Sequence, residues 1–328
     1  MELLTEKNYR WIYTYDYEPH SVWEPWRDEL GPSDWIEAEV EAVVARVRAN
    51  DMVDNLATFA LLSDSHYVEN GTWDDTAASL RALGNHIDFD GVIHLGDMTD
   101  GLLPLDKTLA IEKKCIDDMK SMGKPVYLTP GNHDYNYFHG NPETKYPDRP
   151  QYFVDLPDKK LRMIFMDSFD PEEDVRYGFS MYSIHWLDTV LRTLPHDFKA
   201  IVFSHVTCLL SLQAWASDMR NRHELVTTMD KYADKILAFI NGHNHCDHIF
   251  NGLNNGKFPI ISINCAKCEY FTEHKPEGAV VPKRRLGDRT QESFDILQVD
   301  TAAGQLYFTR FGAGQDRIVE NHKGRFYH

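Results

Sequence analysis

The 328 residues are enough for one large α/β domain or two smaller ones, and we expect one domain with an appendage. Asp and Glu number 51 against 34 Lys and Arg, and the resulting formal charge of −17 disfavours nucleic acid as a partner because it opposes attraction to a phosphate backbone. No apolar run reaches the roughly 18 residues of a membrane span and the N-terminus lacks a leader pattern, so we expect a cytoplasmic protein without membrane contact.

The first 57 residues are predicted to form an extension packed on the core, which leaves residues 58–328 as the main domain. Aromatic residues are frequent at the start of this extension. Packing in a core is a commoner role for such residues than stacking on nucleic-acid bases. An amphipathic helix is predicted next, over residues 33–49, with Ser33 as its N-cap. A stripe of apolar residues along this helix must be buried against another element. The stripe consists of Ile36, Val40, Val43, Val44 and Val47.

Short β-branched runs after this helix are predicted to be strands, and their near-continuous apolarity indicates that both faces are covered. The runs are TFALLS (58–63), GVIHLG (91–96), PVYLTP (125–130), LRMIFM (161–166), AIVFS (200–204), KILAFI (235–240) and PIISIN (259–264). Helical stretches at 74–84 and 105–122 separate the first three runs, as parallel βαβ connections require. The apolar segments 294–300 and 305–311 are predicted to pair as an antiparallel hairpin, and the charged stretch 273–293 to be a long loop.

Polar residues follow five of these runs at the point where each strand should end. They are Asp64 and His66, then Asp97 and Asp100, then Asn132, His133 and Asp134, then His205, and finally His243 and His245. In open α/β sheets the carboxyl ends of the strands form the edge where ligands bind. We therefore expect five separate segments to converge on one site.

The residue types in these five segments indicate a pair of metal ions. Carboxylate, imidazole and carboxamide together suit borderline divalent ions such as Mn, Fe or Zn, whereas Mg and Ca prefer cages of oxygen. Glycine precedes Asp97, Asn132 and His243, and it allows the tight turns that would aim short side chains at a crowded centre. Two aspartates cannot cancel the charge of two divalent ions, so the site should stay positive and attract an anion such as phosphate.

The ordered motifs D-x-H, G-D-x-x-D, G-N-H-D, a lone His after a strand, and G-H-x-H resemble those of the calcineurin-like metallophosphoesterase superfamily. The resemblance covers residues 58–264 and implies an α/β fold of the αββα sandwich type. In that fold two mixed β-sheets are flanked by helices, and here an N-terminal helical extension would be added. The resemblance assigns one metal to Asp64, His66, Asp97 and His245 and the second to Asp97, Asn132, His205 and His243. Asp97 would bridge the two ions.

The same resemblance implies an activity and two further roles. The chain would be a metal-dependent phosphoester hydrolase that uses hydroxide activated by the two ions. His133 matches the residue that stabilises the transition state or protonates the leaving oxygen, and Asp100 matches the residue that orients this histidine. A small-molecule phosphoester is the expected substrate, and the sequence makes no prediction of the oligomeric state.

Departures from two branches of the superfamily narrow the expectation. The protein Ser/Thr phosphatases have Arg-Gly after the second motif and Arg before G-N-H, where this chain has Gly101-Leu102 and Pro130. Purple acid phosphatases have tyrosine where this chain has Asp100. The motifs are instead similar to the bacterial phosphodiesterase-like branch, so we expect a phosphodiesterase. The alternatives are a phosphomonoesterase of the same fold, a nuclease, which the charge of the chain disfavours, and a non-catalytic scaffold, which the intact motifs disfavour.

Three other features are interpreted as structural. His248, the third histidine of the segment GHNHCDH, matches no motif position. The pair Cys265 and Cys268 has zinc-like or redox-like spacing but no second pair, which favours structural thiols. The cluster at 283–285, KRR, is interpreted as solvated loop charge in preference to a phosphate clamp, whereas Arg149 and Arg176 remain candidates for such a clamp.

Overall fold

The computed structural model describes residues 27, 30–50, 53–67, 71–101, 105–135, 151–251, 258–320 and 323–326. The aromatic run at 9–26 and Arg149 lie outside the described residues. The helices are α3 (Trp35–Arg48), α4 (Trp73–Gly84), α5 (Leu105–Lys120), α6 (Met181–Arg192) and α7 (Arg222–Asp230). None of the helices in the described ranges has both the length and the apolarity that crossing a membrane requires.

Two mixed sheets form the centre of the molecule. The first has strand order β13-β12-β11-β10-β1-β2-β3, and the second has the order β4-β5-β6-β7-β9-β8. The strands of the first sheet are β1 (Ala57–Leu62), β2 (Gly91–His94), β3 (Val126–Leu128), β10 (Ser293–Asp300), β11 (Gln305–Gly312), β12 (Arg317–Glu320) and β13 (Lys323–Phe326). Those of the second sheet are β4 (Tyr152–Leu156), β5 (Leu161–Met166), β6 (Lys199–Ser204), β7 (Ile236–Asn241), β8 (His248–Phe250) and β9 (Ile260–Ser262).

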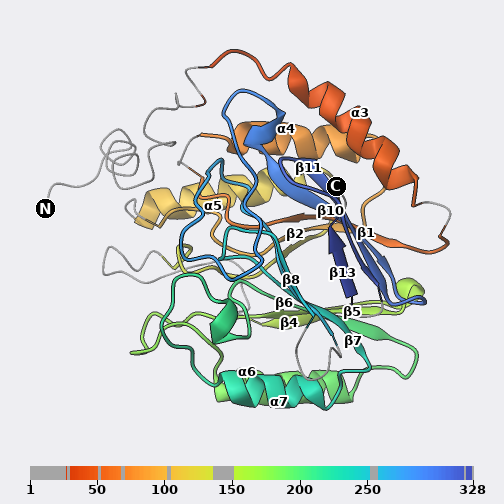
Figure 1. Ribbon diagram of the computed structural model, residues 1–328, viewed down its shortest axis with the longest axis vertical. Helices are drawn as coiled ribbons and strands as arrows, with labels where there is room; N and C mark the ends of the chain where they lie inside the picture. The colour runs from red at the N-terminus through yellow and green to blue at the C-terminus, as the bar shows by residue number, and fades with distance from the viewer. Residues whose placement is uncertain are drawn as a thin grey trace, which may run out of the picture.

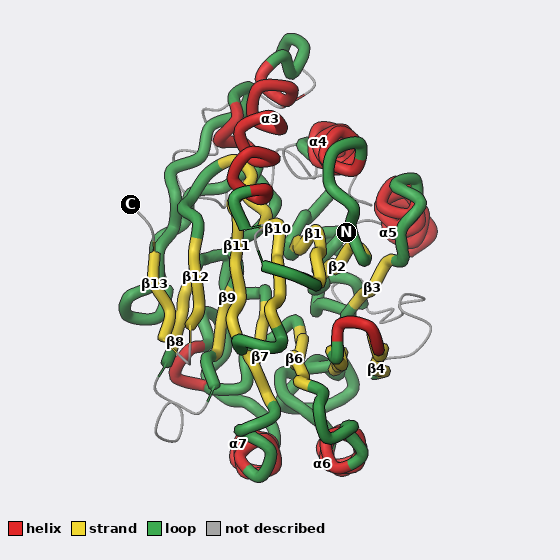
Figure 2. Tube along the Cα trace, turned by 90° about the vertical axis from the view of Figure 1, so that its right-hand side faces the viewer, coloured by secondary structure: helices red, strands yellow, loops and turns green. Residues whose placement is uncertain are grey.

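The helices cover the outer faces of the two sheets, so the chain forms four layers. Helices α3, α4 and α5 lie over the first sheet, and α6 and α7 lie over the second (Figure 1). Viewed from the side, the two helical layers stand at opposite ends with the strands between them (Figure 2). The predicted αββα sandwich with two mixed sheets is therefore confirmed.

Three apolar clusters hold these layers together. One lies between the first sheet and its helices, and a second fills the space between the sheets, where Phe59 of β1 and Phe203 of β6 are both fully buried. The third lies between the second sheet and α6 and α7. Every residue of β1, β5 and β7 is buried, which confirms that strands with continuous apolar sequence are covered on both faces.

All seven apolar runs and the C-terminal hairpin form strands as predicted. Strand β1 pairs in parallel with β2, and β2 with β3, while β10 and β11 form the antiparallel hairpin. The parallel order β5-β6-β7-β9 brings the ends of the later runs to one edge of the second sheet. Four strands were not predicted: β4, β8, β12 and β13. All four are short, and β4, β8 and β13 lie at the edges of their sheets.

Helix α3 confirms the predicted apolar stripe but not the predicted cap. Val40, Val43, Val44 and Val47 are buried in the cluster that includes α4 and β11. The N-cap is Asp34 and not Ser33, because the Ser33 hydroxyl instead donates a hydrogen bond of 2.6 Å to Asp75 Oδ1. This contact joins the start of α3 to α4. The division of the chain at residue 57 stays a prediction.

Candidate dimetal active site

The seven residues expected to bind metal come together between the ends of five strands. Asp64 and His66 follow β1, Asp97 follows β2, Asn132 follows β3, His205 follows β6, and His243 and His245 follow β7. All seven are buried, with at most 6% of any residue exposed. Because strands from both sheets contribute, the site lies where the carboxyl ends of the two parallel sets meet.

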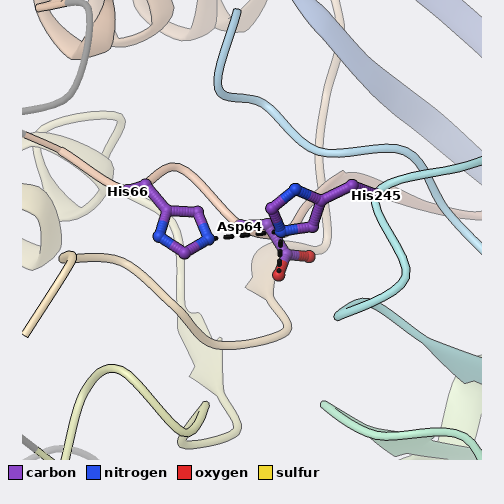
Figure 3. Close-up of side chains that lie close together, drawn as sticks. All are labelled: Asp64, His66 and His245. Atoms are coloured by element: carbon purple, nitrogen blue, oxygen red, sulfur yellow. Dashed lines mark hydrogen bonds and ion pairs between the residues drawn. The ribbon is translucent and has the colours of Figure 1, made fainter. Parts of the chain in front are cut away.

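One group of ligand atoms consists of Asp64, His66 and His245. His245 Nε2 lies 3.1 Å from Asp64 Oδ1 and 3.2 Å from His66 Nε2. Figure 3 shows the two imidazole rings on either side of a small space, with the Asp64 carboxylate next to the His245 ring. The ligand atoms of these three residues are close enough together to bind one ion.

A second group consists of Asp97, Asn132, His205 and His243. His205 Nε2 lies 3.2 Å from Asp97 Oδ2, 3.1 Å from Asn132 Oδ1 and 3.2 Å from His243 Nδ1. Asp97 Oδ2 is also 3.7 Å from His66 Nε2 in the first group. The Asp97 carboxylate therefore lies between the two groups, which is where a bridging ligand would have to be.

Three of the four histidines have one ring nitrogen already bound to an acceptor. His66 Nδ1 is 2.8 Å from Asp100 Oδ1, His205 Nδ1 is 2.7 Å from the carbonyl oxygen of Leu95, and His245 Nδ1 is 2.5 Å from Glu269 Oε1. Donation from Nδ1 fixes the tautomer and leaves the lone pair of Nε2 directed at the centre.

The residues fit a pair of metal ions. His66 Nε2 and His245 Nε2 face each other at 3.2 Å, as do His243 Nδ1 and His205 Nε2, and two lone pairs at that distance repel unless a cation or proton lies between them. Imidazole, carboxylate and carboxamide donors are the set that borderline divalent ions prefer. This arrangement can therefore bind the ions that the sequence predicts.

Protonation of the metal-free site supports the same interpretation. Burial lowers the pKa of His205, but Asp97 and Asp64 raise it more, to about 9. Burial and the charge of His205 lower the pKa of His243 to about 3. Without a metal ion, a proton on His205 thus supplies positive charge beside the aspartates. Metal binding would displace that proton, as is usual when an imidazole becomes a ligand.

The backbone of the site is strained. Asp64, His66, Asp97, His243 and His245 all have positive φ, between 41° and 64°. Residues with side chains rarely adopt this conformation, and when they do they are concentrated at functional sites. Five candidate ligands in the left-handed region indicate that packing elsewhere in the fold maintains the geometry of the centre.

Two glycines allow the loops of the second group to touch. A Cβ atom on Gly131 would lie 2.1 Å from Asp97 Oδ1, and one on Gly96, whose φ is +94°, would lie 2.5 Å from the Gly131 nitrogen. Any side chain at either position would push the Asp97 loop away from the Asn132 loop.

Asp100 contacts two histidines of the site. It was expected to orient His133, and it contacts that ring through its backbone, while Asp100 Oδ1 bonds to His66 Nδ1. His133 Nδ1 donates to the backbone carbonyl oxygen of Asp100 at 2.7 Å, and the His133 backbone N–H donates to Asp97 Oδ1 at 2.8 Å. The Asp100 side chain reaches His66 because D-x-H and G-D-x-x-D follow adjacent parallel strands, β1 and β2.

Two acidic residues support the site but received no role from the sequence. Asp134 accepts hydrogen bonds from the backbone N–H groups of Asp97, Met98 and Gly131, at 2.8, 2.8 and 2.9 Å, and so joins the two loops. Its place in the motif G-N-H-D was the only available signal. Glu269, which accepts from His245, belongs to no motif, and its side chain is 3% exposed.

The remaining features lie outside the two ligand groups. His248 is in β8 and bonds through Nε2 to the carbonyl oxygen of Glu277 at 3.1 Å. Cys265 and Cys268 are buried free thiols. In the cluster 283–285, Lys283 and Arg285 are exposed, as expected of solvated loop charge. Arg284 is half-buried and donates to the backbone carbonyls of Cys265 and Ala266 at 3.0 and 3.1 Å. Arg176 is exposed and does not line the pocket at the site.

A pocket of about 230 Å³ opens above the ligands. It is lined by His66, Asp97, His133, Trp215, His243, His245, Glu269 and Phe271. The Trp215 ring centroid is 5.0 Å from that of His245 and 5.5 Å from that of His243, so an aromatic wall stands beside the candidate metals. A substrate in this pocket would contact both ligand groups and His133.

Comparison with known proteins agrees with this geometry. The family model described as calcineurin-like phosphoesterase matches residues 57–247, more than half of the chain. The chain therefore belongs to the calcineurin-like phosphoesterase family, a dimetal-dependent family, and is a metal-dependent phosphoester hydrolase.

A curated relative and two solved structures refine the comparison. A protein of Arabidopsis thaliana named manganese-dependent ADP-ribose/CDP-alcohol diphosphatase is 26% identical, over 51% of this chain and 68% of its own. A dimetal phosphatase from Danio rerio matches 82% of this chain and all of its own with a TM-score of 0.62 at 15% identity. GAP50, an anchor in the inner membrane complex of Plasmodium, matches 84% of this chain and 88% of its own with a TM-score of 0.54 at 13% identity. At these identities the two structures show a shared fold.

Proposed function

We propose that the chain hydrolyses a small phosphodiester, or a diphosphate that joins two organic groups, at a centre of two Mn²⁺ ions. The observation that carries the proposal is the pair of adjacent ligand groups with Asp97 between them at the floor of one pocket. When bound, two such ions would activate water and neutralise charge that develops on the phosphoryl oxygens. Manganese is proposed because the donors are mixed nitrogen and oxygen and because the Arabidopsis relative is named as manganese-dependent.

The charges around the pocket favour a diester over a monoester. None of the described residues that line the pocket is a lysine or an arginine. A phosphomonoester dianion needs more positive charge for binding than a phosphodiester monoanion, and the two ions would supply most of it. Lys275 lies behind the aromatic wall, with Nζ 4.2 Å from the Trp215 ring centroid. Each phosphorus of a diphosphate bridge between two organic groups also has a single negative charge, and the name of the Arabidopsis relative refers to compounds of that kind.

The side chains around the pocket would have different roles in metal binding and proton transfer. Asp97 would bridge the ions through its carboxylate, while its Oδ1 fixes the backbone of His133. The bond from His133 Nδ1 to the Asp100 carbonyl makes Nε2 the ring nitrogen that can exchange a proton with a substrate. We propose that His133 protonates the leaving oxygen or stabilises the transition state, in the manner of a general acid.

Two chromogenic substrates test the proposed preference. We expect kcat/KM for bis(p-nitrophenyl) phosphate in Mn²⁺ buffer to equal or exceed that for p-nitrophenyl phosphate. ADP-ribose, a diphosphate that joins two organic groups, is tested in the same buffer, and we expect it to be hydrolysed. The Asp97→Asn variant serves as the control for a contaminating phosphatase. A preference for the monoester of about a hundredfold or more, roughly 2.7 kcal/mol in transition-state binding, would replace the diesterase assignment by a phosphomonoesterase.

A further inference from the structure

The segment 265–269, Cys-Ala-Lys-Cys-Glu, lies beside the first ligand group. Its backbone is joined to the Asp64 loop, because Ala266 N–H donates to the Ser63 carbonyl at 2.8 Å and Lys267 N–H to the Asp64 carbonyl at 3.1 Å. Arg284 holds the same segment from the other side through the carbonyls of Cys265 and Ala266. Asp64 and residues 265–269 therefore share one rigid frame.

Two charged side chains of this segment form a chain of contacts that ends on His245. Lys267 Nζ lies 2.8 Å from Glu269 Oε2, and Glu269 Oε1 lies 2.5 Å from His245 Nδ1. The side chains of Lys267 and Glu269 are 2% and 3% exposed. Burial of two charges is expensive unless they are paired, so the pair must be formed whenever this region is folded.

The geometry determines how His245 presents its second nitrogen. Donation from Nδ1 to Glu269 leaves Nε2 facing Asp64 Oδ1 at 3.1 Å and His66 Nε2 at 3.2 Å. A carboxylate behind a ligating imidazole fixes the ring orientation and increases its basicity. Glu269 has the position that this arrangement requires.

Lys267 neutralises the charge of Glu269. The side chains of His245, Cys265 and Glu269 could by themselves form a metal site, but the Lys267 ammonium already neutralises the Glu269 carboxylate there. An unneutralised Glu269 at the wall of the pocket would reduce the positive charge that a phosphate group meets. With Lys267 in place, the pair adds no net charge to the site.

We propose that Lys267 and Glu269 are a positioning pair: Glu269 sets the His245 ring for metal binding, and Lys267 cancels the charge of Glu269 so that the site keeps its attraction for phosphate. The inference rests on the role of His245 as a metal ligand in the proposed function. It predicts different effects for the two members, on metal affinity for Glu269 and on KM for Lys267, whereas a pair that only stabilises the fold would give the same effect for both.

Titration of the metal-free full-length protein with Mn²⁺, followed by calorimetry, measures the first effect. In Glu269→Gln we expect affinity at one of the two sites to fall about 10- to 100-fold, the range found when residues that support a ligand are changed, with the other site unchanged. In Lys267→Met we expect no loss of Mn²⁺ affinity and a higher KM for bis(p-nitrophenyl) phosphate. Glu292→Gln is the matched control, since Glu292 is a buried carboxyl that contacts Thr76 and not the ligands; it should bind Mn²⁺ as the wild type does.

Two further variants keep the outcomes distinct. His245→Ala should abolish one Mn²⁺ site; if it does not, the ligand assignment of the proposed function is wrong. The double variant Lys267→Met/Glu269→Gln leaves no unpaired buried charge, so it should fold even where a single variant does not, and it should show the weakened site. If His245→Ala loses a site while folded Glu269→Gln and the double variant keep both at wild-type affinity, the positioning pair is refuted and the metal site stands.

Discussion

Two clusters of buried charge lie close together in this protein and differ in how their charged and polar side chains are paired. One is the candidate metal centre, and the other is an arginine–aspartate quartet formed by Asp247, Asp295, Arg310 and Arg317, each at most 2% exposed. Asp247 is only two residues from His245, so the two clusters share one loop. Their contacts nevertheless indicate opposite roles.

The quartet balances its own charge. Arg310 Nη2 lies 2.6 Å from Asp247 Oδ1 and Arg310 Nε lies 2.9 Å from Asp295 Oδ1, while Arg317 pairs with both aspartates. Three of its residues lie on the regular strands β10, β11 and β12, and none of the four has positive φ. The quartet therefore needs no ligand, and it anchors the loop that follows β7.

The metal centre does not balance itself. Its imidazole nitrogens face each other and five of its residues have positive φ. His243 Nε2 and Asp100 Oδ2 are among the buried atoms of the described residues that have no hydrogen-bond partner, as is Arg317 Nε of the quartet. Buried polar atoms in native proteins are almost always satisfied, so exceptions need an explanation. Both clusters bury charge. The candidate metal centre differs from the structural quartet in having imidazole nitrogens that face each other and residues with strained backbone.

The largest predicted effect concerns the quartet. Arg310→Met would leave two buried aspartates with one arginine, and we expect a loss of about 3–5 kcal/mol in the free energy of unfolding. Arg222→Met is the control, because Arg222 pairs with Asp218 on the surface at 3.1 Å and such pairs contribute less than about 1 kcal/mol. Urea unfolding of metal-free protein measures both variants. Equal losses would show that the quartet is not a structural anchor.

A smaller effect comes from a buried carboxyl outside both clusters. Burial raises the pKa of Glu292 from 4.5 to about 7, although hydrogen bonds from Thr76 and Gln291 oppose the shift. Because the folded-state pKa is higher than the unfolded one, the stabilising contribution is full below about pH 4.5 and is lost as pH rises through about 7. The contribution is on the order of 3 kcal/mol.

Glu292→Gln should remove this contribution. The unfolding free energies of wild type and variant, measured in urea at several pH values, should differ by an amount that changes between pH 4.5 and 7 and is constant above that window. Using the difference between the two proteins cancels the other groups that titrate in the same window. Parallel curves would mean that Glu292 is ionised in the folded protein.

The third prediction distinguishes a residue that acts on the transition state, His133, from a residue that binds metal, Asn132. His133→Asn should lower kcat by roughly a hundredfold with metal content unchanged, because His133 is proposed to act on the transition state and its Nδ1 is bound to a backbone carbonyl. Asn132→Ala is the matched change one residue earlier, and it should lose metal instead. Loss of metal from His133→Asn would move His133 into the group of ligands.

Much of the site could be predicted because its residues are close in the sequence to the strands that position them. Each predicted ligand directly follows an apolar run, and the parallel pairing of those runs brings the polar ends together. Strands such as β4 could not be predicted in this way, because its residues are mostly half-buried and do not alternate as one apolar face. Short edge strands depend on their neighbours more than on their own sequence.

The supporting residues were missed because their partners are distant in the chain. Glu269 meets His245 across 24 positions, and the Asp100 side chain meets His66 across 34, and no motif includes either pair. The sequence predicted that Asp100 orients His133, and in the structure the contact is made by the backbone carbonyl of Asp100. The packing of adjacent strands decides which histidine ring each motif side chain contacts.

The central claim is that the facing nitrogens and carboxylates bind two metal ions, and counting the ions tests it most directly. Elemental analysis after Mn²⁺ reconstitution, with excess metal removed by gel filtration, should give about two ions per chain for wild type and about one for His205→Ala. Arg222→Met, far from the ligands, should match wild type. One ion or fewer in the wild type, unchanged in His205→Ala, would contradict the account.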